Sequence, residues 1–282
     1  MSTTTSTPYE TLIDALDSAK TCACVGIDPV LERIPEDVPG ESDLARIQSF
    51  CLGTLESAAQ HVRIVKPQSA CFERYGSPGY TILERVIARA RELDLYVILD
   101  AKRGDIGSSA THYAVGASNM GAHWITCSPY MGRSSIEPFL NEDLGVFALC
   151  KTSNPDAQEL QAKSMTGGGD VSDLVGSMIT SMGTNVGAVV GATNNHEDLT
   201  DLRKSMPDTM FLVPGVGAQG GTIDDVRAMI RPNASSPGEL GVVINASRSV
   251  IFPDRASGES WEESIARASG EFACQCAALH TA

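Results

Sequence analysis

Short apolar runs alternate with longer amphipathic segments along the chain. The runs are too short for helices, and several are bounded by Pro, Gly or Asp, as buried strands are. We predict strands at 22–27, 62–66, 95–99, 124–127, 146–150, 187–190, 210–213 and 241–244. Between them apolar residues recur at helical spacing, which predicts helices near 44–58, 82–93, 108–120, 133–141, 171–182, 196–205 and 222–230.

Two further helices are predicted near the ends of the chain. Thr7-Pro8-Tyr9-Glu10 has the form of a capping box with proline in the first turn, and apolar residues follow on one helical face as far as Ala19. Ser260 and Glu263 form a second capping box, ahead of a terminal helix whose apolar positions run to Leu279.

This order of elements predicts the fold class. Strands that alternate with helices form a parallel sheet, and eight such units in 282 residues indicate a closed barrel. We therefore predict an α/β protein, a (β/α)8 TIM barrel that forms a single domain over residues 1–282 with an extra N-terminal helix. An open doubly wound sheet is the alternative, but no GxGxxG motif follows the first strand. The segment 152–170 is predicted to be a surface loop or lid.

The charge balance limits the partners that we expect. The 21 Lys and Arg residues against 35 Asp and Glu residues give a formal net charge of −14. Such a surface favours neither nucleic acid nor an anionic membrane, so an anionic ligand would need a local site. No apolar run is long enough to span a membrane, and the first residues lack the pattern of a secretory signal. We expect a cytoplasmic protein.

The metal-binding residue types lack the usual spacings. The eight Cys residues contain no CxxC pair and the five His residues no HExxH pair, so we expect no metal site. Several Cys residues lie inside apolar runs. We interpret them as small, unpaired core residues that suit a reducing compartment.

Polar residues collect directly after the predicted strands. They are Asp28, Lys66, Asp100, Lys102, Ser128, Lys151, Ser153, Thr193, Gln219 and Arg248. Because barrel enzymes place their chemistry at the C-terminal ends of the strands, we predict a site there. The alternative is that polar residues simply resume where strands end, but Lys or Asp follows four of the runs.

The segment 100–106, DAKRGDI, is the most informative. Asp100 and Lys102 are two positions apart at a strand end, so both side chains are expected to point into the barrel. A buried lysine needs a carboxylate partner, and Lys66 would complete a Lys–Asp–Lys row. Such a row is costly to bury, and a lysine held cationic there can protonate a carbanion. The alternatives are a surface ion-pair cluster and, for residues 103–105, an adhesion signal.

Two segments near the end of the chain predict a phosphate site. PGVGAQGG at 214–221 follows the seventh strand, and its glycines allow close approach of backbone N–H groups to an anion. Arg248 follows the eighth strand, and the loops after strands seven and eight form the usual phosphate site of such barrels. The alternative is an ordinary glycine-rich turn.

Together these motifs resemble one family. DxKxxDI at 100–106, a lysine ending the second strand, PGVGAQGG and the arginine after the eighth strand are similar to orotidine 5′-monophosphate decarboxylases, especially the longer-chain branch. The resemblance runs in order from Asp28 to Arg248, although DxKxxD alone is shared with related sugar-phosphate synthases and decarboxylases. It implies decarboxylation of orotidine 5′-monophosphate to uridine 5′-monophosphate in de novo pyrimidine biosynthesis, without metal or cofactor.

The resemblance also implies catalytic roles. Lys66, Asp100, Lys102 and Asp105 would form a charged network. Within it, Lys102 would protonate C6 of the pyrimidine as carbon dioxide leaves, and Asp100 would sit against the substrate carboxylate. In the family, the aspartate at the position of Asp105 reaches into the site of the other subunit, which implies a homodimer with two shared active sites.

Contacts to the nucleoside are implied in the same way. Asp28 and Lys66 would hold the ribose hydroxyls, and Ser153 would bind the amide edge of the pyrimidine. Ile106 of the partner subunit would line the pyrimidine pocket.

The remaining implied contacts concern the phosphate and two supporting positions. Gln219 and Arg248 would grip the phosphate, and Pro214 and Ser109 complete the substrate-binding set. Ser109 stands where many relatives have Thr, which keeps the hydroxyl. The segment 151–155, KTSNP, departs from the shorter forms of the family.

Two other functions stay open at this point. Related sugar-phosphate synthases and decarboxylases use a similar Asp/Lys/Asp set with magnesium, but the isoleucine after Asp105 and the lack of an obvious acidic metal pair favour the orotidine hypothesis. A catalytically silent nucleotide sensor is expected to lose one member of the charged set, and all members are present here.

Overall fold

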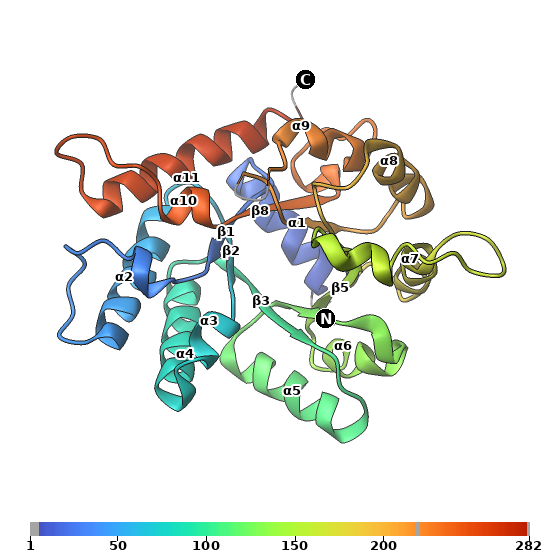
Figure 1. Ribbon diagram of the computed structural model, residues 1–282, viewed down its shortest axis with the longest axis horizontal. Coiled ribbons are helices and arrows are strands. Elements are labelled where there is room, and N and C mark those ends of the chain that lie inside the picture. The colour runs from blue at the N-terminus through green and yellow to red at the C-terminus, as the bar shows by residue number, and fades with distance from the viewer. Residues whose placement is uncertain (1–5, 218–219, 281–282) are drawn as a thin grey trace, which may run out of the picture.

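The structure is a computed structural model that describes residues 6–217 and 220–280. Its centre is a closed barrel of parallel strands that pair in chain order, with β8 closing against β1 (Figure 1). The strands are β1 Ala23–Ile27, β2 Ile64–Pro67, β3 Tyr96–Arg103, β4 Trp124–Cys127, β5 Gly145–Lys151, β6 Val186–Val190, β7 Phe211–Val213 and β8 Val242–Ala246. The predicted (β/α)8 barrel is confirmed.

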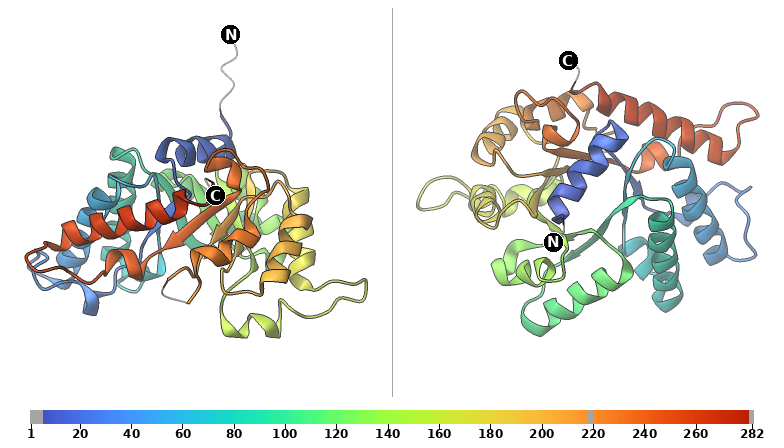
Figure 2. Two further views of the ribbon diagram at one scale, coloured as in Figure 1. Left: turned by 90° about the horizontal axis from the view of Figure 1, so that it is seen from above. Right: turned by 180° about the vertical axis from the view of Figure 1, so that it is seen from behind.

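Helices lie around the barrel and, in the case of the first helix, across one end of it (Figure 1 and Figure 2). They are α1 Pro8–Ala19, α2 Asp43–Ala58, α3 Ala70–Glu73, α4 Gly76–Glu92, α5 Gly107–Met120, α6 Glu137–Leu140, α7 Val171–Ser181, α8 His196–Ser205, α9 Ile223–Val226, α10 Arg248–Ile251 and α11 Trp261–Ala277. Both predicted capping boxes are present, because Thr7 Oγ1 accepts from the Glu10 N–H and Ser260 Oγ from the Glu263 N–H.

Two predicted helices are shorter than the sequence pattern indicates. The segment 133–141 forms a 3-10 turn at Arg133–Ser135 and then α6, because Pro138 is tolerated only in the first turn of a helix. The segment 222–230 forms α9 and a 3-10 turn at Arg227–Met229. The chain is extended at Ile230, two residues ahead of a proline.

The extra N-terminal helix closes one end of the barrel. Seen from behind, α1 lies across the end where the strands begin (Figure 2). The backbone oxygen of Pro8 accepts hydrogen bonds from Tyr96 Oη at 2.8 Å and Trp124 Nε1 at 3.2 Å, at the first residues of β3 and β4. The opposite end, where the strands finish, therefore remains open for a site.

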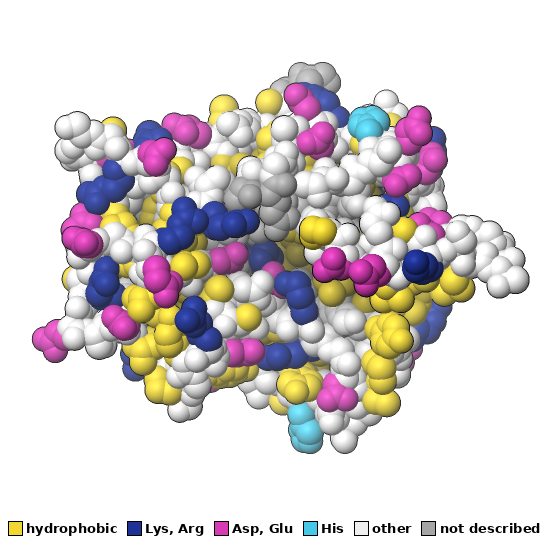
Figure 3. Space-filling view, in the orientation of Figure 1, with side chains coloured by type: hydrophobic (Ala, Val, Ile, Leu, Met, Phe, Trp, Pro, Cys, Tyr) yellow, Lys and Arg dark blue, Asp and Glu magenta, His cyan; other side chains and the backbone are white. Residues whose placement is uncertain are grey.

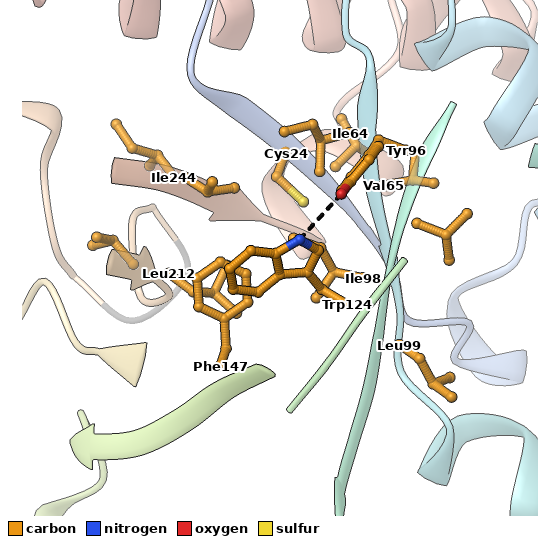
Figure 4. Close-up of a cluster of buried hydrophobic side chains, with 14 of the residues drawn as sticks. Cys24, Ile64, Val65, Tyr96, Ile98, Leu99, Trp124, Phe147, Leu212 and Ile244 are labelled. Atoms are coloured by element: carbon orange, nitrogen blue, oxygen red, sulfur yellow. Dashed lines mark hydrogen bonds between the residues drawn. The ribbon is translucent and has the colours of Figure 1, made fainter. Parts of the chain in front are cut away.

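Large aromatic side chains fill the barrel interior below that open end. Trp124 and Phe147 pack with ring centroids 4.4 Å apart, and Trp124 Nε1 donates to Tyr96 Oη at 3.1 Å (Figure 4). A Cβ at Gly145 would overlap the Trp124 ring, so this strand needs glycine there. The interior is thus a packed core rather than a channel.

The thiols are free, as the sequence pattern predicts. Burial raises the pKa of Cys24 and of Cys150 to about 12, so these side chains stay protonated and pack as small apolar groups. Cys274 differs, since it is exposed on α11. No helix within the described ranges is long and apolar enough to cross a bilayer.

Candidate active site

A cavity of about 480 Å³ opens at the C-terminal ends of the strands. Figure 3 shows Lys and Arg side chains meeting Asp and Glu side chains in a hollow near the centre of this face. The predicted site residues that line the cavity are Asp28, Lys66, Asp100, Lys102, Ser153, Pro214 and Arg248. Segments far apart in sequence are therefore brought together at the predicted end of the barrel.

Asp100 is the centre of the charged cluster. Lys66 Nζ lies 2.6 Å from its Oδ2, and Lys102 Nζ lies 2.6 Å from its Oδ1. The side chains of Lys66 and Asp100 are only 5% and 8% exposed, whereas that of Lys102 is 48% exposed. Lys66 is thus held beneath the carboxylate, and Lys102 faces the open part of the cavity.

Two neutral donors complete the hydrogen bonding of Asp100, and the sequence analysis missed both. Gln68 Nε2 donates to Oδ2 at 3.0 Å and Thr126 Oγ1 to Oδ1 at 2.8 Å. Each carboxylate oxygen therefore accepts one ammonium and one neutral donor. Gln68 directly follows the second strand and could have been included with the strand-end residues. Thr126 lies within a strand and carries no such signal.

Electrostatics keeps the Lys66–Asp100 pair ionised. Burial opposes ionisation of Asp100, but Lys66 and Lys102 outweigh it and hold its pKa well below the ordinary value of 3.8. Burial likewise opposes the charge of Lys66, but Asp100 and Asp28 outweigh it and raise the Lys66 pKa above 10.5. The ion pair is therefore charged across the neutral range.

The backbone at the end of β3 is irregular. The register with β4 shifts between Leu99 and Arg103, and Lys102 has a left-handed φ of 45°. The prediction that Asp100 and Lys102 share a face rests on regular strand alternation, in which residues two apart point the same way. Asp100 and Lys102 do meet, but through a distorted backbone that the Thr126 hydroxyl supports by accepting the Lys102 N–H at 2.9 Å.

Asp28 directly follows β1, and one of its carboxylate oxygens is an unused hydrogen-bond acceptor. Its Oδ1 atom is buried and makes no hydrogen bond within the described residues. A buried carboxylate oxygen without a donor costs free energy unless a ligand or water supplies one. Since Asp28 lines the cavity, this oxygen is placed to accept a hydrogen bond from a bound molecule.

The other end of the cavity combines a glycine turn with an arginine. Pro214 and Gly215 line it after β7, and the turn is held by the Gly221 N–H donating to the Gly215 oxygen at 3.1 Å. Arg248, the exposed first residue of α10, lines it from the end of β8. This arrangement can bind an anionic group through the Arg248 guanidinium and through backbone N–H groups of the glycine turn. Gln219 lies outside the described residues.

The residues that follow β5 form another wall of the cavity. Thr152, Ser153 and Asn154 line the cavity together with Gln161, a residue that the sequence analysis did not single out. Lys151, the preceding residue, is not among the lining residues, and its Nζ lies 3.3 Å from Asp198 on α8. The polar wall thus consists of hydroxyl and amide groups.

Comparison with known protein families gives one match that covers most of the chain. Residues 12–255 match the model of the orotidine 5′-phosphate decarboxylase / HUMPS family. The chain belongs to this family.

Relatives that match most of the length of this chain support the same membership. An orotidine 5′-phosphate decarboxylase of Rhodopirellula baltica is 38% identical over 86% of this chain and 89% of the relative. One from Roseiflexus castenholzii is 40% identical over 88% and 90%. The solved structure of Leishmania donovani OMP decarboxylase is 30% identical, covers 97% of this chain and 99% of that chain, and has a TM-score of 0.79.

Three residues that the family resemblance assigned to the site do not line this cavity. Asp105 and Ile106 lie in the connection after β3, and Ser109 in the first turn of α5. Ile106 is 44% exposed, and Asp105 Oδ1 accepts the Ile106 N–H at 2.8 Å. These three residues are therefore not part of the cavity wall of their own chain.

No cluster of three or more His, Cys, Asp or Glu residues suited to a metal ion occurs in the ranges 6–217 and 220–280. The polar groups of the cavity are instead two ammonium groups, two carboxylates, hydroxyls, amides and a guanidinium. This set suits an anionic, hydroxylated ligand.

Proposed function

We propose that this protein converts orotidine 5′-monophosphate to uridine 5′-monophosphate and carbon dioxide. The observation that carries the proposal is the Lys66–Asp100–Lys102 cluster at the open end of a barrel of this family. It lies in a cavity that also offers a guanidinium for a phosphate.

The chemical step needs a group that stabilises negative charge on carbon. As the bond from C6 to the carboxylate breaks, carbon dioxide leaves and the bonding electron pair stays on C6. The Lys102 ammonium, fixed by Asp100, stabilises this pair and then transfers a proton from Nζ to C6. Because the charge is already in place, little reorganisation is needed in the transition state. Lys102 regains its proton from solvent.

The rest of the cavity binds the parts of the substrate that do not react. Asp28 and Lys66 hold the ribose hydroxyls, and the unused Asp28 Oδ1 supports this role. Arg248, with Pro214 and Gln219, holds the phosphate, and Ser153 holds the amide edge of the pyrimidine. This binding energy aligns C6 with Lys102.

We further propose that the enzyme is a homodimer with shared sites. Asp105, Ile106 and Ser109 would each complete the cavity of the other subunit. Their separation from the cavity of their own chain supports this arrangement. Exposed apolar side chains on α5 and in the segment that follows β4 are consistent with a buried interface. They are Tyr113, Tyr130 and Met131.

The direct test follows the ultraviolet absorbance of orotidine 5′-monophosphate during incubation with the protein in excess EDTA. The proposal predicts rapid conversion to uridine 5′-monophosphate under these conditions. Conversion of sugar phosphates only after magnesium is added would instead assign the protein to the metal-dependent relatives. Tight nucleotide binding without conversion would assign it to the silent sensors.

A further inference from the structure

The long segment after β5 leaves the cavity and returns to it. The chain first runs along the cavity wall as Thr152, Ser153 and Asn154, and then forms a surface excursion over residues 155–170 that ends at α7 (Figure 1). Most of the excursion is exposed, but Gln161 is half-buried and lines the cavity.

The Gln161 side chain holds Thr152 with both of its polar atoms. Its Oε1 accepts the Thr152 N–H at 2.8 Å, and its Nε2 donates to Thr152 Oγ1 at 2.7 Å. Thr152 Oγ1 in turn donates to Asn154 Oδ1 at 2.6 Å. The residues on both sides of Ser153 are therefore connected to one amide.

The backbone of Gln161 is itself anchored. Its carbonyl oxygen accepts the Ser172 N–H at 3.0 Å in the first turn of α7. Asp170, the residue that caps α7, lies 4.0 Å from Lys151 Nζ at the end of β5. The excursion is thus tied to the barrel at the point where Gln161 reaches the wall.

Ser153 is supported from the opposite side as well. A Cβ at Gly191, directly after β6, would lie 2.6 Å from the Ser153 Cβ and 2.9 Å from its Cα. The Gly191 N–H donates to the Lys151 oxygen at 2.8 Å. Ser153 is therefore packed between the end of β6 and the segment that Gln161 holds, which leaves little freedom in its position.

We infer that Gln161 is a positioning residue for recognition of the pyrimidine. It acts through Thr152 and Asn154 by holding the Ser153 segment against the amide edge of the base. The inference rests on the proposed function, because it assigns Ser153 to the pyrimidine. It predicts that the excursion over 155–170 contributes to recognition of the base and not to binding of the ribose or phosphate.

The test compares two ligands that differ in the base. Dissociation constants for uridine 5′-monophosphate and ribose 5-phosphate are measured by calorimetry for the wild type, Gln161→Ala and Gln158→Ala. Gln158 lies exposed in the same excursion and serves as the matched control. Gln161→Ala should weaken binding of the nucleotide roughly fivefold to tenfold, the loss typical of one or two hydrogen bonds. Its ribose 5-phosphate affinity should stay within about twofold of wild type.

A second variant tests whether Gln161 acts through Thr152. Thr152→Val keeps the N–H but removes the hydroxyl. In a double-mutant cycle, its effect on nucleotide affinity should not add to that of Gln161→Ala. Additive effects, equal losses for both ligands, or unchanged nucleotide binding in Gln161→Ala would each overturn the inference. These outcomes are distinct from failure of the proposed function, which would appear as no orotidine 5′-monophosphate conversion by the wild type.

Discussion

At the residue scale, the site depends on how one carboxylate is held. Asp100 accepts hydrogen bonds from Lys66, Lys102, Gln68 and Thr126, two on each oxygen. Thr126 has a second task, since its oxygen also accepts the N–H of Lys102, whose backbone is left-handed. One hydroxyl therefore fixes both the carboxylate and the proposed proton donor.

Thr126→Val should lower kcat by roughly tenfold to a hundredfold, because a small displacement of Lys102 Nζ misaligns it with C6. The affinity for uridine 5′-monophosphate should change little, since Thr126 holds the reacting group rather than the ligand. Thr126→Ser keeps the hydroxyl and should recover most of the rate. Steady-state kinetics and product binding for the two variants check this, and equal losses in both would contradict it.

Removal of the Asp100 charge should lower the stability of the fold as well as the catalytic rate. Asp100→Asn leaves Lys66 buried without its main partner and should lower the free energy of unfolding by about 3 kcal/mol. Because the folded Asp100 pKa is below its ordinary value of 3.8, its contribution is present above that value and is lost as the pH falls towards the folded pKa.

Urea denaturation of the wild type and Asp100→Asn at several pH values measures the difference between their free energies of unfolding. It should be constant between about pH 5 and pH 8 and should narrow near pH 3, where the unfolded wild type takes up the proton. A difference that grows on acidification would have the wrong sign for a carboxyl with a lowered pKa.

At the element scale, periodicity predicted the barrel but not the details at its open end. Each predicted apolar run forms a strand in the structure. Strands of a parallel barrel are buried on both faces, so nearly all of their residues are apolar. The left-handed Lys102 could not be predicted, since it is stabilised by Thr126 from a neighbouring strand. Gln161 lies in a polar segment without periodicity, so only the three-dimensional structure shows that it reaches the cavity.

The proposed phosphate-binding role of the segment between β8 and α10 can be tested at Arg248. Arg248→Ala should raise the KM for orotidine 5′-monophosphate by roughly 10- to 100-fold, the range for a lost hydrogen bond to a charged group. Arg255→Ala is a suitable control, because that guanidinium pairs with Asp37 and does not line the cavity. Unchanged kinetics for Arg248→Ala would remove the proposed phosphate site from this segment.

At the scale of the whole molecule, the barrel separates stability from function. Helix α1 lies across the end where the strands begin (Figure 2) and is held there by hydrogen bonds from Tyr96 and Trp124 to the Pro8 oxygen. The charged groups line the cavity at the other end. The family resemblance implies that Asp105 and Ile106 act in the site of the other subunit, and neither residue lines the cavity of its own chain.

Hybrid dimers test the proposed shared site. Lys102→Ala and Asp105→Ala should each be nearly inactive alone, because the first lacks the proton donor and the second the residue supplied in trans. After the two variants are mixed and subunits exchange, about a quarter of wild-type activity should return, since half of the dimers then contain one intact site. No recovery, with exchange verified by differently tagged subunits, would show that the two residues do not serve sites across a dimer.

Lys102 is the proposed proton donor in the decarboxylation. The most direct measurement is the rate of uridine 5′-monophosphate formation at saturating orotidine 5′-monophosphate for the wild type and Lys102→Ala, with product affinity measured alongside. This role predicts that the variant loses turnover by several orders of magnitude while still binding the nucleotide. Near-normal turnover by Lys102→Ala would contradict it.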